Sequence, residues 1–345
     1  MGKTLGVVGA WAYHRLYRGD TSWPRRLVLT LPMRVLVEQT ERVVRDFLGA
    51  AGMLAAGANI DGGPAVGAAV HTIMGGVATE PWHLCPDQPA VLLGTQDMLL
   101  SRALNRGYAS PRARWPMEYA ALNRDCLWVV DEIQLMGVGL STSAQLQAFR
   151  CSDRAVGTTA TWWMSATLQS SWLAHGELRA DVDALDAACL RIPAEERHGG
   201  SFSGAKTCEV VTIPRASDKN LSAWAQSVLD AHEQSTGGAH GRVTLAVCNT
   251  VDDAVALHSQ LQKQAAKAGS TAELRLVHSR FRPMERAAWV DAFLSREACG
   301  PGVDRIIVAT QVVEAGVDIS ATTLITQLAP WASMVQRFGR CARYG

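Results

Sequence analysis

A short phosphate-binding signature opens the chain, and an acidic pair follows an apolar run in its first half. Gly2-Lys3-Thr4 matches the last three positions of G-x-x-x-x-G-K-[ST], a loop whose amides and lysine hold phosphates and whose hydroxyl holds Mg²⁺. Asp131-Glu132 comes directly after the apolar run Cys126–Val130. Such an aspartate can hold Mg²⁺ through water, and such a glutamate can orient an attacking water. These residue types predict hydrolysis of a nucleoside triphosphate.

Ser165-Ala166-Thr167 follows a second apolar run, Thr161–Met164. One interpretation is that Ser165 and Thr167 link the acidic pair to a bound nucleic acid through hydrogen bonds. The other is that these hydroxyls only cap the end of a strand. Both interpretations stay open on the residues alone, just as the acidic pair could be a turn or helix cap and Gly2-Lys3-Thr4 a chance tripeptide.

An aspartate and a pair of arginines mark the last part of the chain. Asp318 lies in the segment Ala309–Ile319, which follows another apolar run, and Gln336–Arg343 reads QRFGRCAR. Arg340 and Arg343 are three residues apart, so on a helix they would share a face. Two guanidinium groups on one face suit a γ-phosphate, as arginine fingers. The alternative is that these arginines are only solvent-exposed basic residues at the end of a helix.

Short β-rich runs alternate with helical patterns, and each motif follows such a run. The expected strands are 27–31, 91–93, 126–130, 161–164, 209–213, 243–247, 274–277, 305–308 and 323–328. After the first of them, apolar residues from Leu36 to Leu48 recur with helical spacing. This alternation predicts an α/β fold with mainly parallel sheets covered on both faces. In such sheets, sites lie beyond the carboxyl ends of the strands.

The length and composition fit two domains. The chain has 345 residues, of which 48% are hydrophobic, and a domain takes roughly 150 residues. The stretch Ala194–Lys206 is charged, contains Gly and Ser, and shows no periodicity. We therefore expect a first domain at 1–195, a linker at 196–207 and a second domain at 208–345.

Charge and cysteine content narrow the class of protein. A net charge of +1 gives no global attraction to nucleic acid, so any polyanion site must be a local groove. The sequence shows no secretory signal pattern and no apolar run near the ~18 residues of a membrane span, so we expect no membrane partner. The eight cysteines form no C-x-x-C pair and no zinc spacing with histidine. Scattered cysteines of this kind indicate reduced thiols and a cytoplasmic location.

The order of the motifs is itself informative. G-K-T, D-E-x-Q, S-A-T, G-V-D and Q-R-x-G-R-x-x-R follow one another in this sequence and resemble the motif series of superfamily two helicases. The resemblance covers most of the chain. It implies two tandem RecA-like domains of the P-loop NTPase type, with ATP and Mg²⁺ bound between the two halves.

The resemblance also implies a role for each matching residue. The nucleotide would be bound by Gly2, Lys3, Thr4 and Asp318, and the metal by Thr4 and Asp131. The catalytic set would be Asp131, Glu132, Gln336, Arg340 and Arg343, with Ser165 and Thr167 as coupling residues. The nucleic-acid path would be lined by Arg34, Gly75, Gly76, Thr95 and Gln96 in the first half and by Asn249, Thr250, Arg280 and Thr310 in the second. The bland alternatives for this path are a surface arginine, an ordinary glycine turn and a helix-capping threonine.

Longer segments point to one branch of this superfamily. They read LPMRVLVEQT at 31–40, HTIMGG at 71–76, GTQDMLLSR at 94–102, DEIQLMG at 131–137 and HSRFRP at 278–283. This set resembles the CRISPR-associated helicase/nuclease of type I interference systems, with the type I-G branch, formerly I-U, most similar. The resemblance implies an ATP-driven motor that moves 3′ to 5′ along single-stranded DNA. Its partners would be an RNA-guided CRISPR surveillance complex and an HD nuclease domain.

The sequence departs from the family pattern at both ends. We expect the chain to start inside the phosphate loop and to stop soon after the arginine motif, as if truncated at both ends. It contains no His-Asp dipeptide, so the HD nuclease is expected in the missing part or in a separate chain. Two alternatives therefore stay open: a catalytically inactive fragment that binds nucleic acid or a partner, and a general superfamily two helicase of RNA or DNA repair.

Overall fold

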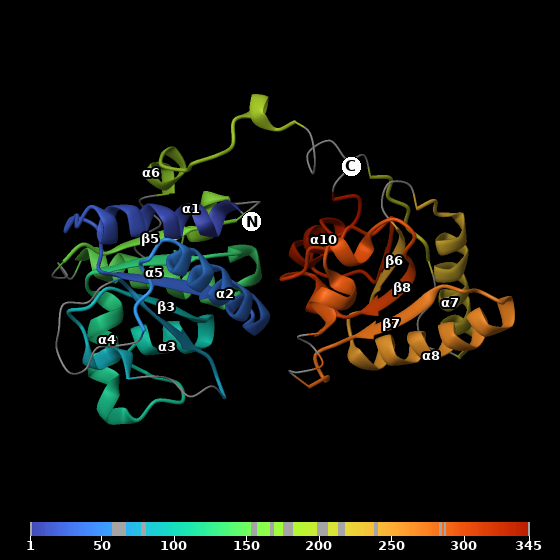
Figure 1. The fold of residues 1–345 in the computed structure, drawn as a ribbon, viewed down its shortest axis with the longest axis horizontal. Coiled ribbons are helices and arrows are strands. Elements are labelled where there is room, and N and C mark those ends of the chain that lie inside the picture. The colour runs from blue at the N-terminus through green and yellow to red at the C-terminus, as the bar shows by residue number, and fades with distance from the viewer. Residues whose placement is uncertain are drawn as a thin grey trace. The chain divides into compact units, whose positions relative to one another are not determined.

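The computed structural model describes two compact units, Met1–Leu190 and Arg191–Gly345 (Figure 1). The described residues are 2–56, 67–76, 81–152, 157–165, 169–174, 182–198, 206–212, 218–237, 241–282, 285 and 288–343. Each unit has its own sheet and its own cores. None of the described helices combines the length and apolar character needed to cross a membrane.

The first unit is a parallel sheet with the order β2-β3-β1-β4-β5. Its strands are β1 Arg26–Leu31, β2 Ala69–Ile73, β3 Ala90–Thr95, β4 Cys126–Val130 and β5 Ala160–Trp163. Its helices are α1 Gly2–Trp11, α2 Arg34–Ala50, α3 Gln96–Ala103, α4 Trp115–Asn123, α5 Val138–Ser152 and α6 Val182–Ala187. The strand order puts β1 in the centre, between β3 and β4.

Alternate residues of β4 serve the two faces of this sheet. Leu127 and Val129 pack into the core that contains α1 and α2. Trp128 and Val130 pack into the core that contains α3, α4 and α5. A strand buried on both faces must be apolar throughout, which is why its sequence reads as a continuous hydrophobic run.

The second unit is a parallel sheet with the order β7-β8-β6-β9. Its strands are β6 Arg242–Val247, β7 Glu273–Val277, β8 Asp304–Ala309 and β9 Thr323–Thr326. Its helices are α7 Asp218–Gln234, α8 Val251–Ala268 and α10 Trp331–Phe338. One core joins α7 and α8 to the sheet, and a second core on the other face contains Phe293, Leu294 and Ile319.

Short helical turns complete both units. Three-ten turns lie at Trp82–Leu84, Arg112–Arg114, Ile133–Leu135, Ser170–Leu173, Ala194–Glu196, Glu297–Cys299 and Gln311–Val313, and π-helical turns at Ala12–Tyr17 and Val290–Leu294.

The predicted α/β fold with parallel sheets is confirmed, and one of the expected strands is wrong. The described part of the expected strand 209–213, Glu209–Thr212, is exposed and not in a strand. Val210 and Val211 favour a strand by residue type, but a β-prone run needs a neighbouring strand, and neither sheet pairs with it. Conversely β2, which we did not expect as a strand, pairs with β3.

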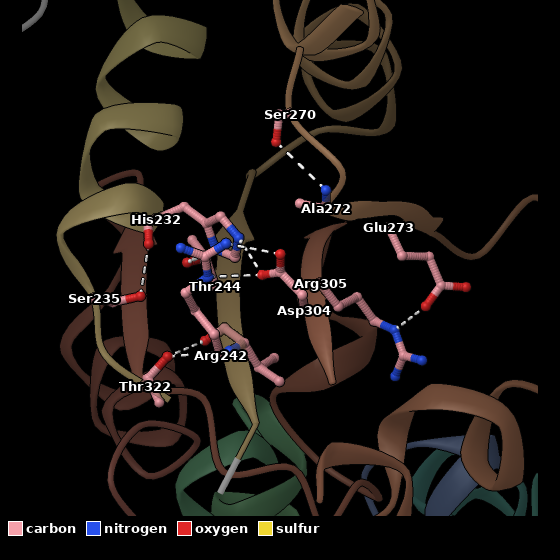
Figure 2. Close-up of polar contacts among 11 residues, drawn as sticks. His232, Ser235, Arg242, Thr244, Ser270, Ala272, Glu273, Asp304, Arg305 and Thr322 are labelled. Carbon is pink, nitrogen blue, oxygen red and sulfur yellow. Dashed lines mark hydrogen bonds and ion pairs between the residues drawn. The ribbon is translucent and has the colours of Figure 1, made fainter. Parts of the chain in front are cut away.

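A polar cluster fastens the amino ends of β6 and β8 to α7 (Figure 2). Asp304 binds Arg242 through two hydrogen bonds of 2.7 Å each. The buried ring of His232 lies 2.9 Å from the Asp304 carboxylate and 2.8 Å from the hydroxyl of Thr244. Burial lowers the pKa of His232, and Arg242 adds to this effect while Asp304 opposes it. These contacts lie at the opposite end of the sheet from the carboxyl ends of the strands.

Candidate functional site

Lys3 and the acidic pair lie together in the first unit. The Nζ atom of Lys3 is 3.4 Å from Glu132 Oε1 and 3.6 Å from Asp131 Oδ1. These residues are 128 or more positions apart in the chain, so the fold brings them together. The side chain of Lys3 is 44% exposed, and those of Asp131 and Glu132 are 12% and 24% exposed. One cation and two carboxylates therefore share a site that stays open to solvent on the lysine side.

The position of Asp131 follows from the end of β4. Its backbone N–H donates to the carbonyl of Thr30 on β1, and its carboxylate accepts a hydrogen bond of 2.8 Å from the backbone N–H of Glu132. Burial raises the pKa of Asp131, and the Lys3 ammonium only partly offsets this effect. A buried carboxylate of this kind gains strongly from a second cation beside it.

Glu132 occupies an unusual backbone conformation. Its φ of 50° and ψ of 48° lie in the left-handed region, which costs a non-glycine residue about 1–3 kcal/mol. This turn aims the Glu132 side chain at both Lys3 and Gln134: Gln134 Nε2 donates to Glu132 Oε2 at 2.6 Å. Strain held at such a position is typical of functional sites.

A hydrogen-bonded link runs from the acidic pair to β5. The hydroxyl of Ser165 donates to Gln134 Oε1 at 2.7 Å, and Gln134 in turn donates to Glu132. The part of this link that joins Ser165 to the acidic pair is therefore present, with Gln134 as its middle member, and its contact to a nucleic acid stays a prediction. Thr167, the other coupling candidate, lies outside the described residues.

Gly2, Lys3 and Thr4 form the first turn of α1. The first backbone N–H groups of a helix have no partner within the helix, and its dipole favours an anion there. No acidic residue occurs in this first turn. The helix end, the Lys3 ammonium and the buried Asp131 fit a metal–triphosphate complex: Lys3 and the free amides would hold phosphate oxygens, and Asp131 and Thr4 would hold Mg²⁺. Among the described residues, no group of three or more His, Cys, Asp or Glu side chains is arranged to hold a metal ion.

The nucleic-acid candidates of the first unit follow three neighbouring strands. Arg34 is the exposed first residue of α2, just after β1. Gly75 and Gly76 form a turn just after β2, and Gly76 has a φ of 76°. Thr95 ends β3, and Gln96 begins α3. Thr95 occupies the N-cap position of α3 but makes no side-chain cap hydrogen bond there. Because β2, β3 and β1 are adjacent and parallel, these residues lie together at the carboxyl ends of the three strands.

The arginine segment of the second unit differs from our expectation. The helix α10 ends at Phe338, so Arg340 and Arg343 do not share a helical face, and that prediction was wrong. Arg340 is buried and donates to the carbonyls of Glu314 and Val317, each at 2.6 Å. Backbone hydrogen bonds between Ala321 and the residues around Cys341 stop the helix by turning the chain back to the sheet.

Arg343 and Asp318, two further candidates, form an ion pair of 3.3 Å. Both side chains are 28% exposed, and the backbone N–H of Arg343 donates to the hydroxyl of Ser320. Gln336 lies half-buried on α10. In this structure the two arginines are therefore held by the segment that contains Asp318.

The nucleic-acid candidates of the second unit lie at the carboxyl ends of β6, β7 and β8. Asn249 and Thr250 are exposed after β6, and Thr250 caps α8 by accepting a hydrogen bond from the N–H of Asp253. Arg280 is exposed after β7 and pairs with Asp252 at 2.8 Å. Thr310 follows β8 and is buried, and within the described part of the chain its hydroxyl has no hydrogen-bond partner.

Three residues that our list of candidates omitted prove central to these contacts. Gln134 joins Glu132 to Ser165. Glu314 and Arg337 form a buried ion pair of 2.8 Å. Each lies inside a motif that we had singled out, but a polar or charged residue in a motif does not show by itself whether it faces a ligand or the interior.

Comparisons with known proteins bear on both units. Residues 240–345 match the family described as "CRISPR-associated nuclease/helicase Cas3, C-terminal". A Myxococcus xanthus protein named for Cas3 is 31% identical over 174 residues, which is 48% of this chain and 21% of that protein. The chain is similar to the helicase portion of Cas3 proteins.

Solved structures agree at the level of the fold. Crystalline T. fusca Cas3 with AMPPNP is 21% identical to this chain, with a TM-score of 0.53, covering 92% of this chain and 38% of Cas3. S. cerevisiae Dbp5 bound to RNA and ADP BeF3 is 18% identical, with a TM-score of 0.58, covering 100% of this chain and 74% of Dbp5. Both units thus have the RecA-like fold of these solved structures. The chain spans less than half of the Cas3 proteins it matches, and its placement in the type I-G branch stays a prediction.

Proposed function

We propose that this chain is an ATP-dependent nucleic-acid translocase, the helicase motor of CRISPR type I interference. The observation that carries the proposal is the meeting of Lys3 with Asp131 and Glu132 at the start of α1. Phosphoryl transfer to water needs a cation for the phosphates, a carboxylate for the metal and a carboxylate for the water. A lysine at a helix N-terminus beside a buried aspartate and a strained glutamate can provide all three. The similarity to Cas3 supports the assignment to CRISPR interference.

Each residue of this site has its own role in the proposed reaction. ATP would supply the γ-phosphoryl group, and Mg²⁺ would help to neutralise its charge. Lys3 and the amides of the first turn of α1 hold phosphate oxygens. Asp131 and the Thr4 hydroxyl would hold the metal. Glu132 orients the attacking water and accepts its proton. Asp318, Gln336, Arg340 and Arg343 are our candidates for further contacts to the nucleotide.

Single-stranded DNA is the proposed track. Phosphate contacts from arginine, hydroxyls and backbone amides carry no sequence information, which suits a motor that must move along any sequence. The candidates at the strand ends of both units offer this chemistry. The link from Glu132 through Gln134 to Ser165 supports communication between hydrolysis and the track. We further propose an RNA-guided CRISPR surveillance complex and an HD nuclease domain as partners.

One observation favours a second candidate function. Two guanidinium nitrogens of Arg340 donate hydrogen bonds to backbone carbonyls, so this side chain is not presented to a ligand in this structure. A module that binds nucleotide or nucleic acid without hydrolysis would need no arginine finger. Turnover of ATP distinguishes the two functions.

The test of the proposal is ATP hydrolysis by wild-type protein and two site variants in Mg²⁺. Lys3→Ala should abolish turnover by weakening the hold on the phosphates. Glu132→Gln keeps the size and hydrogen bonding of the side chain, so it should retain nucleotide binding and lower turnover by about 100-fold or more, as for loss of a general base. Lys263→Ala and Glu209→Gln, which change exposed residues elsewhere, are the matched controls.

Full-rate hydrolysis by Lys3→Ala would overturn the assignment of the phosphate site. Loss of nucleotide affinity in Glu132→Gln would reassign Glu132 to a structural role. A wild-type chain that binds nucleotide without turnover would support the second candidate function.

A further inference from the structure

A buried ion pair joins the segment after β8 to α10. The guanidinium of Arg337 binds Glu314 through both Nε and Nη2, with Glu314 Oε1 at 2.8 Å from each nitrogen. Both side chains are 3% exposed. A fully buried Arg–carboxylate pair is costly to desolvate and is held only by good geometry and further hydrogen bonds. The structure supplies those further bonds.

The remaining N–H groups of Arg337 reach two other segments. Nη1 donates to the hydroxyl of Thr326 at 2.8 Å and to the carbonyl of Gln327 at 3.0 Å, at the end of β9. Nη2 donates to the side-chain oxygen of Asn249 at 3.0 Å, in the loop between β6 and α8. We call Arg337, Glu314, Thr326, Gln327 and Asn249 the Arg337 hub.

The hydrogen-bonding capacity of the Arg337 guanidinium is almost fully used within the hub. A guanidinium has five N–H groups; Arg337 donates four hydrogen bonds, to Glu314, Thr326, Gln327 and Asn249, and its Nη2 also lies 2.8 Å from Glu314 Oε1. Arg337 is therefore not available to a phosphate without breaking the hub. Because every bond is buried or partly buried, movement of one segment alone would leave a polar group unpaired, which is unfavourable. The four segments should move together.

Two members of the hub extend it to the candidate binding residues. The backbone carbonyl of Glu314 accepts from Nη2 of Arg340 at 2.6 Å, so Glu314 touches both arginines. On the other side, Asn249 donates to the carbonyl of Leu328 at 2.7 Å and is followed by Thr250, the cap of α8. The hub thus stands between the arginine segment and the loop that holds two candidate contacts to nucleic acid.

We propose that Arg337 is a positioning residue that couples the arginine segment of Arg340 and Arg343, our candidates for nucleotide contact, to the Asn249–Thr250 loop, our candidate for nucleic-acid contact. The inference rests on the proposed function and adds to it the route by which one ligand influences the other. Only a rigid planar fork reaches from α10 to the three other segments, so lysine, a single point charge, cannot replace arginine here. Coupling through a buried hub is reciprocal: nucleotide changes affinity for DNA, and DNA changes affinity for nucleotide by the same factor.

The experiment measures this factor directly with binding alone. The probes are a single-stranded oligodeoxythymidine and AMPPNP with Mg²⁺, and the quantity is the ratio of oligonucleotide Kd values without and with AMPPNP. For wild-type protein a ratio that departs from one by about fivefold or more, in either direction, is expected. Arg337→Lys should bring the ratio close to one. Arg242→Lys is the matched control, since it alters another Arg–carboxylate pair of the same unit, at the opposite end of the sheet, and should keep the wild-type ratio.

A second pair of variants guards against misfolding of Arg337→Lys. Thr326→Val removes one acceptor of the hub and keeps the shape of the side chain, so it should lower the coupling. Thr323→Val makes the same change on the same strand outside the hub and should not. Wild-type coupling in folded Arg337→Lys or in Thr326→Val would overturn the hub. So would a wild-type chain that binds both probes without mutual effect, although the proposed function would then survive. Binding of neither probe would refute the proposed function, and the hub with it.

Discussion

At the scale of residues, the Lys3 contact to the acidic pair is weak enough to be exchanged. The distances of 3.4 and 3.6 Å and the 44% exposure of Lys3 place it among solvent-screened pairs, which contribute about 1 kcal/mol or less. An incoming polyphosphate can therefore take Lys3 at little cost. Asp131 differs, because its burial raises its pKa and makes a bound cation favourable. Lys3 and Asp131 together are thus suited to a ligand that contains both phosphates and a metal.

The Ser165 link gives a prediction at this scale. Ser165→Ala removes the hydroxyl that donates to Gln134 and frees Gln134 from its fixed orientation beside Glu132. Loss of one such hydrogen bond should lower DNA-stimulated ATP turnover by roughly three- to tenfold. The measurement is the steady-state rate at saturating DNA, with Ser170→Ala as control, because it removes a serine hydroxyl that donates to Asp186 instead. An unchanged stimulated rate would show that the link does not carry coupling.

The sequence predicted some of these residues better than others. Lys3, Asp131 and Glu132 could be paired in advance because their motifs belong to one type of phosphate chemistry. The contacts of Arg340 could not, since the end of α10 depends on a bridge between Ala321 and Cys341 that only the folded chain creates. Gln134 likewise gains its place from Ser165, 31 residues away.

At the scale of elements, apolar runs located most strands of both sheets, including β4 at Cys126–Val130. Apolar runs failed to predict the strands wherever the burial of a segment does not follow from its residue types. The strand β2 contains His71 and Thr72 among its five residues, so its sequence does not read as a buried strand. Val210 and Val211 read as one but lack a pairing neighbour among the described residues. Pairing is a property of the sheet and cannot be read from one segment.

The cluster that fastens α7 to β6 and β8 predicts a pH dependence (Figure 2). Burial lowers the pKa of His232 from the ordinary value of 6.5, so the folded state binds fewer protons here than the unfolded state does. The stabilisation from neutral His232 is therefore complete above pH 6.5 and is lost as the pH falls through 6.5 toward the lower folded pKa. The pKa of Asp304 is lowered by its hydrogen bonds to Arg242, so its stabilisation persists until the pH falls below 3.8.

The second unit should accordingly lose stability between pH 7.5 and pH 5.5, and His232→Gln should reduce this loss, to which His258 and His278 also contribute because burial lowers the pKa of each. Hydrogen exchange at the β6 amides reports on the second unit specifically, and urea unfolding at each pH gives the free energy of unfolding. The exposed His198→Gln is the control and should keep the wild-type slope. An equal slope in His232→Gln would show that His232 is not the group that titrates.

At the scale of the whole molecule, two separate RecA-like units each carry candidate residues at the carboxyl ends of their own parallel strands. The net charge of +1 provides no long-range attraction to a polyanion, so binding to nucleic acid has to come from these local groups. In the motor that we propose, nucleic acid bound to the candidate residues of both units would promote ATP turnover at the site of Lys3, Asp131 and Glu132. Nucleic acid should therefore act as an activator of ATP turnover.

The most direct test of this central claim is ATP hydrolysis in Mg²⁺ with no nucleic acid, with single-stranded DNA and with single-stranded RNA of the same length. We predict turnover that single-stranded DNA stimulates more than RNA does, and that Lys3→Ala abolishes. Stronger stimulation by RNA would keep the motor and contradict the DNA track. Turnover that neither polymer changes, or that Lys3→Ala retains, would contradict the claim that this chain is a nucleic-acid motor driven from the site of Lys3, Asp131 and Glu132.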